Sequence, residues 1–204
     1  SGTSISGSPP VGMLNLIATP VPGGGFAGIF AENVYMDNVS FLSNGTGWSY
    51  VGLYLQDLRY STFRSCNMQG CIGGTGGTGG ASGSAGICFK TTNLSTVSNA
   101  PTSIYFDNIN INAGDHGVIF LPSGYTGSSL AMDPQGVWII DSTIIGQGSD
   151  SVSFTTTDQQ SCELHIKDNT FYSYGTYCLY INNMGELRCS GNTISCGTNS
   201  SSVY

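Results

Sequence analysis

The sequence predicts an all-β solenoid, a chain that winds into stacked coils of short strands. Three observations support this: a composition poor in helix formers, a strand motif that recurs at a long period, and turn residues at a fixed offset from it. Gly accounts for 30 of the 204 residues. Gly, Ser, Thr, Asn and β-branched residues dominate over the good helix formers Ala, Glu, Lys and Leu. We therefore expect no substantial helix.

The first strand of the repeat is a small residue followed by an apolar-x-apolar triplet. It occurs at 28–31, 52–55, 86–89, 117–120, 151–154 and 178–181, and Ser202-Val203-Tyr204 begins a seventh copy. The steps between copies run from 24 to 34 residues. Alternation along a strand places both apolar residues of each triplet inside the solenoid.

A second alternating strand follows each first strand, at 34–36, 58–60, 104–106, 137–139, 164–166 and 187–189. Two residues beyond it stand Asn38, Thr62, Asn108, Asp141, Asp168 and Gly191. Asn, Asp and Gly tolerate the left-handed conformation of a sharp turn, so a turn is expected here. Three residues further come Phe41, Ser65, Ile111, Ile144, Phe171 and Ile194, five of them apolar. They predict a third short strand that returns to the core.

A unit of two or three strands at this period suits about six stacked coils. At roughly 4.8 Å per coil, six coils form a rod about 29 Å long. The rival fold is an antiparallel β-sandwich, whose strands also recur at short spacing. A sandwich does not explain matching apolar positions at one long period.

The turn segments Lys167-Asp168-Asn169-Thr170-Phe171 and Ser190-Gly191-Asn192-Thr193-Ile194 resemble the coils of right-handed parallel β-helices, the pectate-lyase-like superfamily and bacteriophage tailspikes. The resemblance covers residues 28–204. It implies a right-handed parallel β-helix. For a tailspike it also implies a homotrimer on the virion tail that binds a bacterial surface polysaccharide.

We expect two parts in the chain. Residues 1–27, rich in Pro and Gly, form a lead-in arm with one strand at 14–17, and residues 28–204 form the β-helix domain. No helical cap precedes Gly28 and the last repeat stops at Tyr204. Open solenoid ends invite edge pairing, so we expect an excised fragment or an end covered by a partner.

Composition and charge exclude several classes of function. Five Lys and Arg against twelve Asp and Glu give a net charge of −7. So few basic side chains argue against a nucleic-acid surface, which must neutralise phosphates. No apolar run reaches the roughly 18 residues of a membrane helix, so no membrane span is expected. Seven Cys without zinc-like spacing, and no clustered Asp set, predict no metal and no cofactor.

The outward position of the second strand holds the candidate binding residues Tyr35, Arg59, Tyr105, Trp138, His165 and Arg188. Two positions earlier, also outward, stand Asn33, Asp57, Ser103, Gly136, Glu163 and Glu186. Aromatic faces that stack on sugar rings beside carboxylate and guanidinium groups would bind a saccharide. The alternative is an ordinary sheet surface, where aromatics and charge pairs are also favoured.

Within this face the candidate catalytic residues are Glu163, Glu186, His165 and Arg188, because two adjacent coils each supply a carboxylate and a nitrogen-bearing group. Carboxylates about 5 Å apart are the spacing of an acid and nucleophile pair in a retaining glycosidase. His165 and Arg188 would position the sugar. The alternative is two surface ion pairs, which contribute little to stability.

The outward column of the first strand reads Phe30, Tyr54, Cys88, Ile119, Ser153, Tyr180 and Tyr204. Apolar residues in such a column are costly against water. They predict packing between subunits of a homotrimer, or cover by the segments 91–103 and 121–136.

Three functions follow as hypotheses. The first is a tailspike-type domain on a virion tail that binds, or also depolymerises, a bacterial surface polysaccharide. The second is a secreted, monomeric pectate-lyase-like lyase or hydrolase, disfavoured by only five basic residues. The third is a structural spacer in which every column serves packing.

Overall fold

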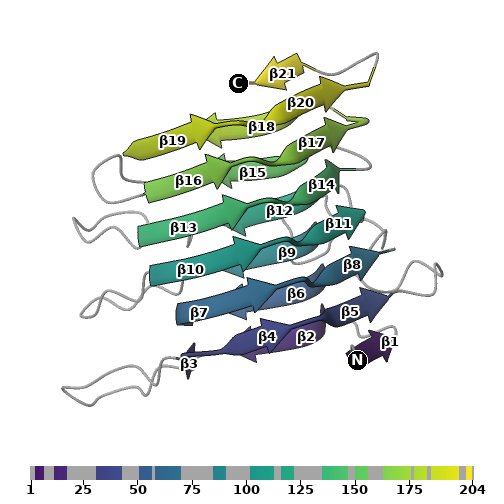
Figure 1. Cartoon of the computed structure of the whole chain (residues 1–204), viewed down its shortest axis with the longest axis vertical. Helices are drawn as coiled ribbons and strands as arrows, with labels where there is room; N and C mark the ends of the chain where they lie inside the picture. The colour runs from purple at the N-terminus through teal and green to yellow at the C-terminus, as the bar shows by residue number, and fades with distance from the viewer. Residues whose placement is uncertain are drawn as a thin grey trace.

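The structure is a computed structural model (Figure 1), and it describes residues 3–6, 12–17, 31–42, 51–56, 58–69, 85–90, 102–112, 116–121, 135–146, 150–155, 163–175, 177–182, 185–197 and 201–203. Within these ranges the regular structure is strand alone, and every strand pairing is parallel. The chain climbs as it runs from left to right through the front sheets of Figure 1 and returns behind them, which is a right-handed coil. The predicted all-β, right-handed parallel β-helix is confirmed, and the antiparallel sandwich is excluded.

Three parallel sheets form the walls, and the chain visits them in the order sheet 1, sheet 2, sheet 3. Sheet 1 contains β2 (Gly12–Ile17), β6 (Val51–Gln56), β9 (Ala85–Lys90), β12 (His116–Leu121), β15 (Val152–Thr155), β18 (Tyr177–Asn182) and β21 (Ser201–Val203). Sheet 2 contains β3 (Ala31–Glu32) and β4 (Tyr35–Asp37), then β7 (Leu58–Arg64), β10 (Thr102–Asp107), β13 (Gln135–Ile140), β16 (Glu163–Lys167) and β19 (Glu186–Ser190). Sheet 3 contains β1 (Thr3–Ser6), β5 (Val39–Leu42), β8 (Asn67–Gln69), β11 (Asn110–Asn112), β14 (Thr143–Gly146), β17 (Thr170–Ser173) and β20 (Thr193–Cys196).

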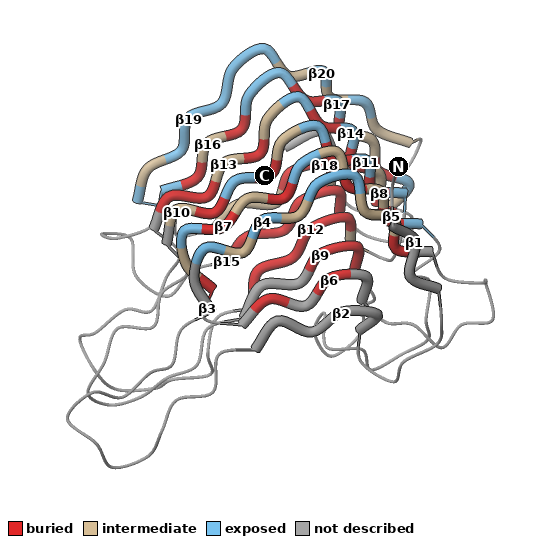
Figure 2. Tube along the Cα trace, turned by 60° about the horizontal axis from the view of Figure 1, so that its bottom comes forward, coloured by how far each residue is buried: buried red, intermediate tan, exposed pale blue. Residues whose placement is uncertain are grey.

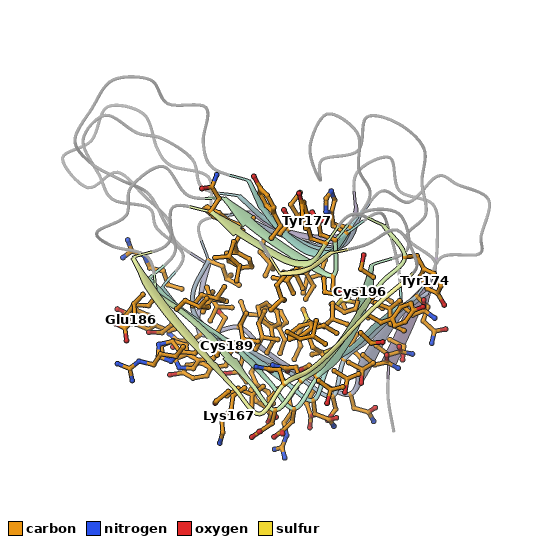
Figure 3. The ribbon with its side chains drawn as sticks, turned by 90° about the horizontal axis from the view of Figure 1, so that it is seen from above. Lys167, Tyr174, Tyr177, Glu186, Cys189 and Cys196 are labelled. Carbon is orange, nitrogen blue, oxygen red and sulfur yellow. The ribbon has the colours of Figure 1, made fainter. Side chains whose placement is uncertain are left out.

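The core lies between the three sheets, where side chains gather (Figure 3), and buried residues of successive coils follow one another along the tube (Figure 2). The first apolar position of the sheet 1 motif is in register from coil to coil and fully or almost fully buried at Leu53, Ile87, Val118, Val152 and Leu179. Aromatic rings stack in the same way, with centroids 5.2 Å apart for Phe63 and Phe106 and 5.8 Å for Phe120 and Phe154. Each such side chain contributes about 1.5–3 kcal/mol by burial.

The sharp turn between sheets 2 and 3 is left-handed in every coil that the structure describes. The residue with positive φ is Asn38, Ser65, Asn108, Asp141, Asp168 or Gly191, with φ between 49° and 67°. The prediction is therefore confirmed at five positions and wrong at Thr62, whose place Ser65 takes. Short polar residues and Gly occupy these positions because a bulkier Cβ is disfavoured in this conformation.

The second coil is displaced from the predicted register. Ile104 and Phe106 of β10 pair with Ser61 and Phe63, and not with Leu58 and Tyr60 of the predicted triplet. A left-handed residue within β7, Tyr60 with φ 47°, explains the error. It interrupts the alternation, so that Leu58 and Ser61 are both fully buried.

The first coil also differs from the prediction. The strand expected at 28–31 is not the first member of sheet 1, because Leu14 of β2 is the register partner of Leu53 and Ala31 of β3 pairs with Leu58. The strand expected at 14–17 exists within β2. Sheets 1 and 3 therefore include strands from the first 17 residues.

Candidate functional site

An aromatic row crosses the outer face of sheet 2. Its members are register partners on successive strands: Tyr35, Thr62, Tyr105, Trp138, His165 and Arg188. The rings of Tyr105 and Trp138 lie face to face, with centroids 4.4 Å apart and planes 8° apart. Trp138 and His165 stack next, with centroids 5.0 Å apart and planes 23° apart. Parallel register thus brings three rings, each about 30 residues from the next, into one stack.

The stacking limits which parts of the aromatic rings a ligand can contact. Both faces of Trp138 are covered by its neighbours, so the stack offers ring edges and polar ring atoms to solvent. The face of Tyr105 opposite Trp138 has the small residue Thr62 as its neighbour, and Tyr35 follows one strand further. The sequence analysis expected aromatic faces that stack on sugar rings, and at Trp138 both faces are already in contact with neighbouring rings.

A hollow of about 270 Å³ opens beside the upper end of the row, lined by Trp138, Ile140, His165, Ile166, Lys167, Arg188 and Ser190. Two apolar side chains, Trp138 and Ile140, form part of its wall. Three nitrogen-bearing groups, His165, Lys167 and Arg188, surround the rest. The chain has only five Lys and Arg and a net charge of −7, so this hollow gathers an unusual share of its basic groups.

The four candidate catalytic residues lie together as predicted. Glu163 is the register partner of Glu186, and His165 is the partner of Arg188. Adjacent strands lie about 4.8 Å apart, so the backbones of the two carboxylate residues have this spacing. The side chains of Glu163 and Glu186 are half-exposed.

Each carboxylate faces a nitrogen group on its own strand. Glu163 Oε2 lies 3.9 Å from His165 Nε2, and Glu186 Oε1 accepts a hydrogen bond from Arg188 Nε. Neither carboxylate lines the hollow. An exposed ion pair between Glu186 and Arg188, worth about 0–1 kcal/mol, and a contact between Glu163 and His165 account for this arrangement without any chemistry.

Arg59 stands outside the row, although the sequence placed it there. It pairs in register with Glu32 and Thr102, three positions before Thr62 on β7. Asp57 lies outside the described residues. The position predicted for Asp57, in the column that also holds Glu163 and Glu186, is taken by Tyr60. The correct register of β7 can be found by aligning the second and third coils at their turns. There Ser65-Cys66-Asn67-Met68 matches Asn108-Ile109-Asn110-Ile111.

Tyr60 is an exposed aromatic that the sequence analysis missed. It lies in one column with Asn33, Ser103 and Gly136, all of which share its positive φ. The column continues through Glu163 to Glu186. Tyr60 therefore extends the polar and aromatic surface beside the row toward the first coil.

The outward column of sheet 1 offers less to a second subunit than predicted. Ile119 is 6% exposed and Ser153 is 8% exposed in the single chain, so Ile119 has almost no surface left for a subunit contact. Tyr180 is half-buried, with its ring centroid 5.4 Å from that of Tyr177. Asn15 is the register partner of Tyr54, in the place predicted for Phe30. Phe30 and the side chain of Tyr54 lie outside the described residues.

Comparisons with protein-family models, curated proteins and solved structures found no match to this chain. The parallel β-helix is therefore shown by its own sheets and register. Among the described residues there is no group of three His, Cys, Asp or Glu side chains placed to hold a metal ion. In the same part of the chain no helix is long and apolar enough to span a membrane.

Proposed function

We propose that the outer face of sheet 2 binds an extended polysaccharide that lies along the aromatic row, parallel to the axis of the rod. The observation that carries this proposal is the in-register stack of Tyr105, Trp138 and His165, which runs directly into the hollow bounded by Arg188 and Lys167. A linear row of equivalent positions suits a ligand that is itself a repeating chain.

The chemistry of the row fits sugar rings and their substituents. Binding sites combine apolar and aromatic walls with a few polar groups that fix orientation. Here Trp138 and Ile140 supply apolar wall, and Ser190, Lys167 and Arg188 supply hydroxyl and cationic groups. The open face of Tyr105, above Thr62, is the place where one sugar ring can stack on an aromatic.

The nitrogen-bearing groups that line the hollow favour a saccharide with carboxylate or other anionic groups, which would compete for them with Glu163, Asp168 and Glu186. Arg and carboxylate form charge-assisted, bidentate hydrogen bonds that are stronger than neutral ones. An uncharged glycan would make less use of Lys167 and Arg188. We propose a bacterial surface polysaccharide as the ligand and a tailspike-type, homotrimeric assembly on a virion tail as its setting, on the resemblance of the turn segments.

The binding test uses the intact chain and an array of bacterial surface polysaccharides, followed by titration with the best ligand. Trp138→Ala removes the centre of the stack, and we expect affinity to fall at least about tenfold, or about 1.4 kcal/mol. Arg188→Ala should weaken binding as well, and its exposed side chain can be removed with little risk to the fold. Tyr174→Ala is the matched control, an exposed aromatic at the end of sheet 3.

The result is clear in either direction. Loss of binding in Trp138→Ala and Arg188→Ala, with normal binding by Tyr174→Ala, supports the row. Equal affinity in all three variants places the ligand elsewhere. If the chain binds no glycan on the array, the row has a packing role only, as the structural-spacer hypothesis states.

A catalytic extension of the proposal assigns Glu163 and Glu186 as the acid and nucleophile of a glycoside hydrolase, with His165 and Arg188 holding the sugar. Its support is the placement of the two carboxylates on adjacent strands beside the hollow. Reducing-sugar release from the bound glycan is compared for wild type, Glu163→Gln and Glu186→Gln. Loss of release in both variants supports the pair, and equal release in all three proteins removes it.

A further inference from the structure

Two cysteines from different sheets meet at one corner of the solenoid. The Sγ atoms of Cys178 in β18 and Cys196 at the end of β20 lie 2.8 Å apart. This is closer than the roughly 3.5–4.0 Å of ordinary van der Waals contact. It is longer than the S–S bond of about 2.05 Å in a disulfide. Cys178 is fully buried, and Cys196 is partly exposed; Figure 3 labels Cys196 on the wall near this corner.

The topology explains why these residues meet. Cys196 is the register partner of Ser173 at the end of β17, and β18 begins four residues after Ser173. Cys178 is the second residue of β18, so it lies where sheet 3 turns into sheet 1. Its Sγ also donates a hydrogen bond to the carbonyl oxygen of Ser195, at 3.0 Å.

Two earlier coils show that this position faces sheet 3. The register partners of Cys178 in previous coils are Ser151, Gly117, Gly86 and Gly52. A Cβ added at Gly117 would meet Ile144 of β14 and the carbonyl of Ser151, and one at Gly86 would meet Ile111 of β11. A side chain at this position is thus directed at the strand that closes the same coil, and in this coil that strand ends in Cys196.

We propose that Cys178 and Cys196 form a disulfide that staples sheet 1 to sheet 3 when the protein meets a small-molecule disulfide such as oxidised glutathione. The thiolate of Cys196 attacks one sulfur of that disulfide and releases one thiolate, which leaves a mixed disulfide on Cys196. Cys178 then loses its proton, attacks Cys196 Sγ and releases the second small thiol. The two protein thiols are oxidised to one disulfide, and the small disulfide is reduced to two thiols.

The order of these steps follows from the environments of the two thiols. Burial, and then the neighbouring Cys196, raise the pKa of the Cys178 thiol to about 12. Only a thiolate attacks a disulfide, so the more exposed Cys196 reacts first. Closure by Cys178 is the slower step, and its rate rises with pH.

The other cysteines whose side chains the structure describes have different surroundings. Cys66 is buried, and its Sγ donates to the carbonyl oxygen of Arg64. Cys189 is exposed, and its Sγ accepts a hydrogen bond from Asn192 Nδ2. Among these four side chains, Cys178 and Cys196 alone lie within bonding reach of each other.

The test uses the intact chain, incubated with oxidised glutathione, quenched with acid and digested with trypsin. Cleavage after Lys167 and Arg188 separates Cys178 from Cys196, so the disulfide appears as a cross-linked pair of peptides. Because Cys189 shares the second peptide, the Cys189→Ser variant is the matched control and must keep the cross-link. Cys178→Ser and Cys196→Ser must lose it.

Stability provides a second measurement. Because the cross-link joins residues 18 positions apart, it restricts the unfolded chain, and we expect oxidation to raise the Tm by about 5–10 °C. Wild type and Cys189→Ser should show this rise, and Cys178→Ser and Cys196→Ser should not. Cross-linking should also proceed faster at about pH 9 than at about pH 7.

Two outcomes overturn the proposal. In the first, Cys196 stops at the mixed disulfide with glutathione and never closes onto Cys178. In the second, Cys178 and Cys196 remain thiols while Cys189 is fully glutathionylated. Both outcomes are read from the same peptide map.

Discussion

The side-chain oxygen of Asn192 accepts a hydrogen bond from the backbone N–H of Asn169, one coil below it, at 2.9 Å. Asn169 does the same for the backbone N–H of Ser142, also at 2.9 Å. The amide nitrogen of Asn169 donates to the carbonyl of Ile139, and that of Asn192 donates to the carbonyl of Ile166. The two side chains thus act as rungs of a ladder that satisfies backbone groups at the turn between sheets 2 and 3.

This ladder predicts a specific loss of stability in Asn169→Ala. The substitution leaves the buried N–H of Ser142 and the carbonyl of Ile139 without these partners, at a cost of about 2–3 kcal/mol in the free energy of unfolding. Denaturant unfolding measures the change. Asn110→Ala, at an exposed strand position, is the control and should change stability by less than about 0.5 kcal/mol. Similar losses in both variants would contradict a role for the ladder.

Gly117→Ala tests the tight corner where sheet 1 faces sheet 3. The new Cβ would meet the side chain of Ile144 and the backbone carbonyl of Ser151, and the carbonyl cannot move without disturbing β15. We expect a destabilisation of about 1–3 kcal/mol from overpacking, measured as a lower Tm. At Gly197 the nearest atom to an added Cβ is 3.2 Å away, so Gly197→Ala should cost less. The reverse order of the two Tm values would refute this account.

Asp150 lies just before β15 of sheet 1 and connects its own coil to the coils on either side. Its Oδ1 accepts a hydrogen bond from the backbone N–H of Tyr177, and its Oδ2 lies 3.4 Å from His116 Nδ1. Asp150→Ala should cost about 1–3 kcal/mol, because it leaves a backbone donor without its partner. Asp150→Asn retains an oxygen for Tyr177 and should cost less. Chemical denaturation of the two variants compares them directly, and an equal cost would show that the charge beside His116 matters more than the hydrogen bond.

The raised pKa of the Cys178 thiol predicts a pH dependence of stability. Its ordinary value is 9.0, and burial beside Cys196 raises the pKa to about 12 in the folded chain. The folded state therefore keeps a proton that the unfolded state loses. This contribution is complete below about pH 9 and disappears as the pH rises toward about 12.

Cys178→Ala removes that contribution. In the presence of reductant, we expect wild type to lose more stability than Cys178→Ala between about pH 8 and pH 10.5. The urea midpoints at the two pH values give the comparison. Parallel curves for the two proteins would show that Cys178 does not hold its proton more tightly after folding.

Much of the fold was predictable from the sequence because the determinants are local and repeated. A triplet such as Val118-Ile119-Phe120 alternates with the period of a strand. A residue such as Asn108 or Asp168 marks the turn that follows the second strand of its coil. Five of six left-handed turn residues follow directly from such spacing. Stacking in parallel register then follows from the recurrence of both signals at one period.

The second coil could not be predicted from alternation, because its determinant is a backbone irregularity. Tyr60 adopts a positive φ, and Leu58 and Ser61 are both buried on either side of it. Ser61 is tolerated inside because its hydroxyl donates to the carbonyl of Arg59 and accepts from the backbone N–H of Val34. A polar residue at a core position gives no signal in a pattern of apolar spacing.

The candidate site was predicted in part for the same reason. Tyr105, Trp138, His165 and Arg188 fall in one row because their coils have regular register, and Arg59 does not because its coil is shifted. That the ring faces cover one another depends on side-chain conformation, which spacing does not specify. The hollow depends on Ile140, Lys167 and Ser190, two residues further along each strand.

The left-handed residues from Asn38 to Gly191 form a single seam along one edge of the rod, and each coil crosses it with a short polar side chain or none. A coil transplanted from another protein, or duplicated within this one, would dock only if it brought such a residue to the same place. The position of the left-handed residue therefore defines how whole coils must be aligned when they are exchanged. Protein engineers can use it as a rule for lengthening the rod by one coil at a time.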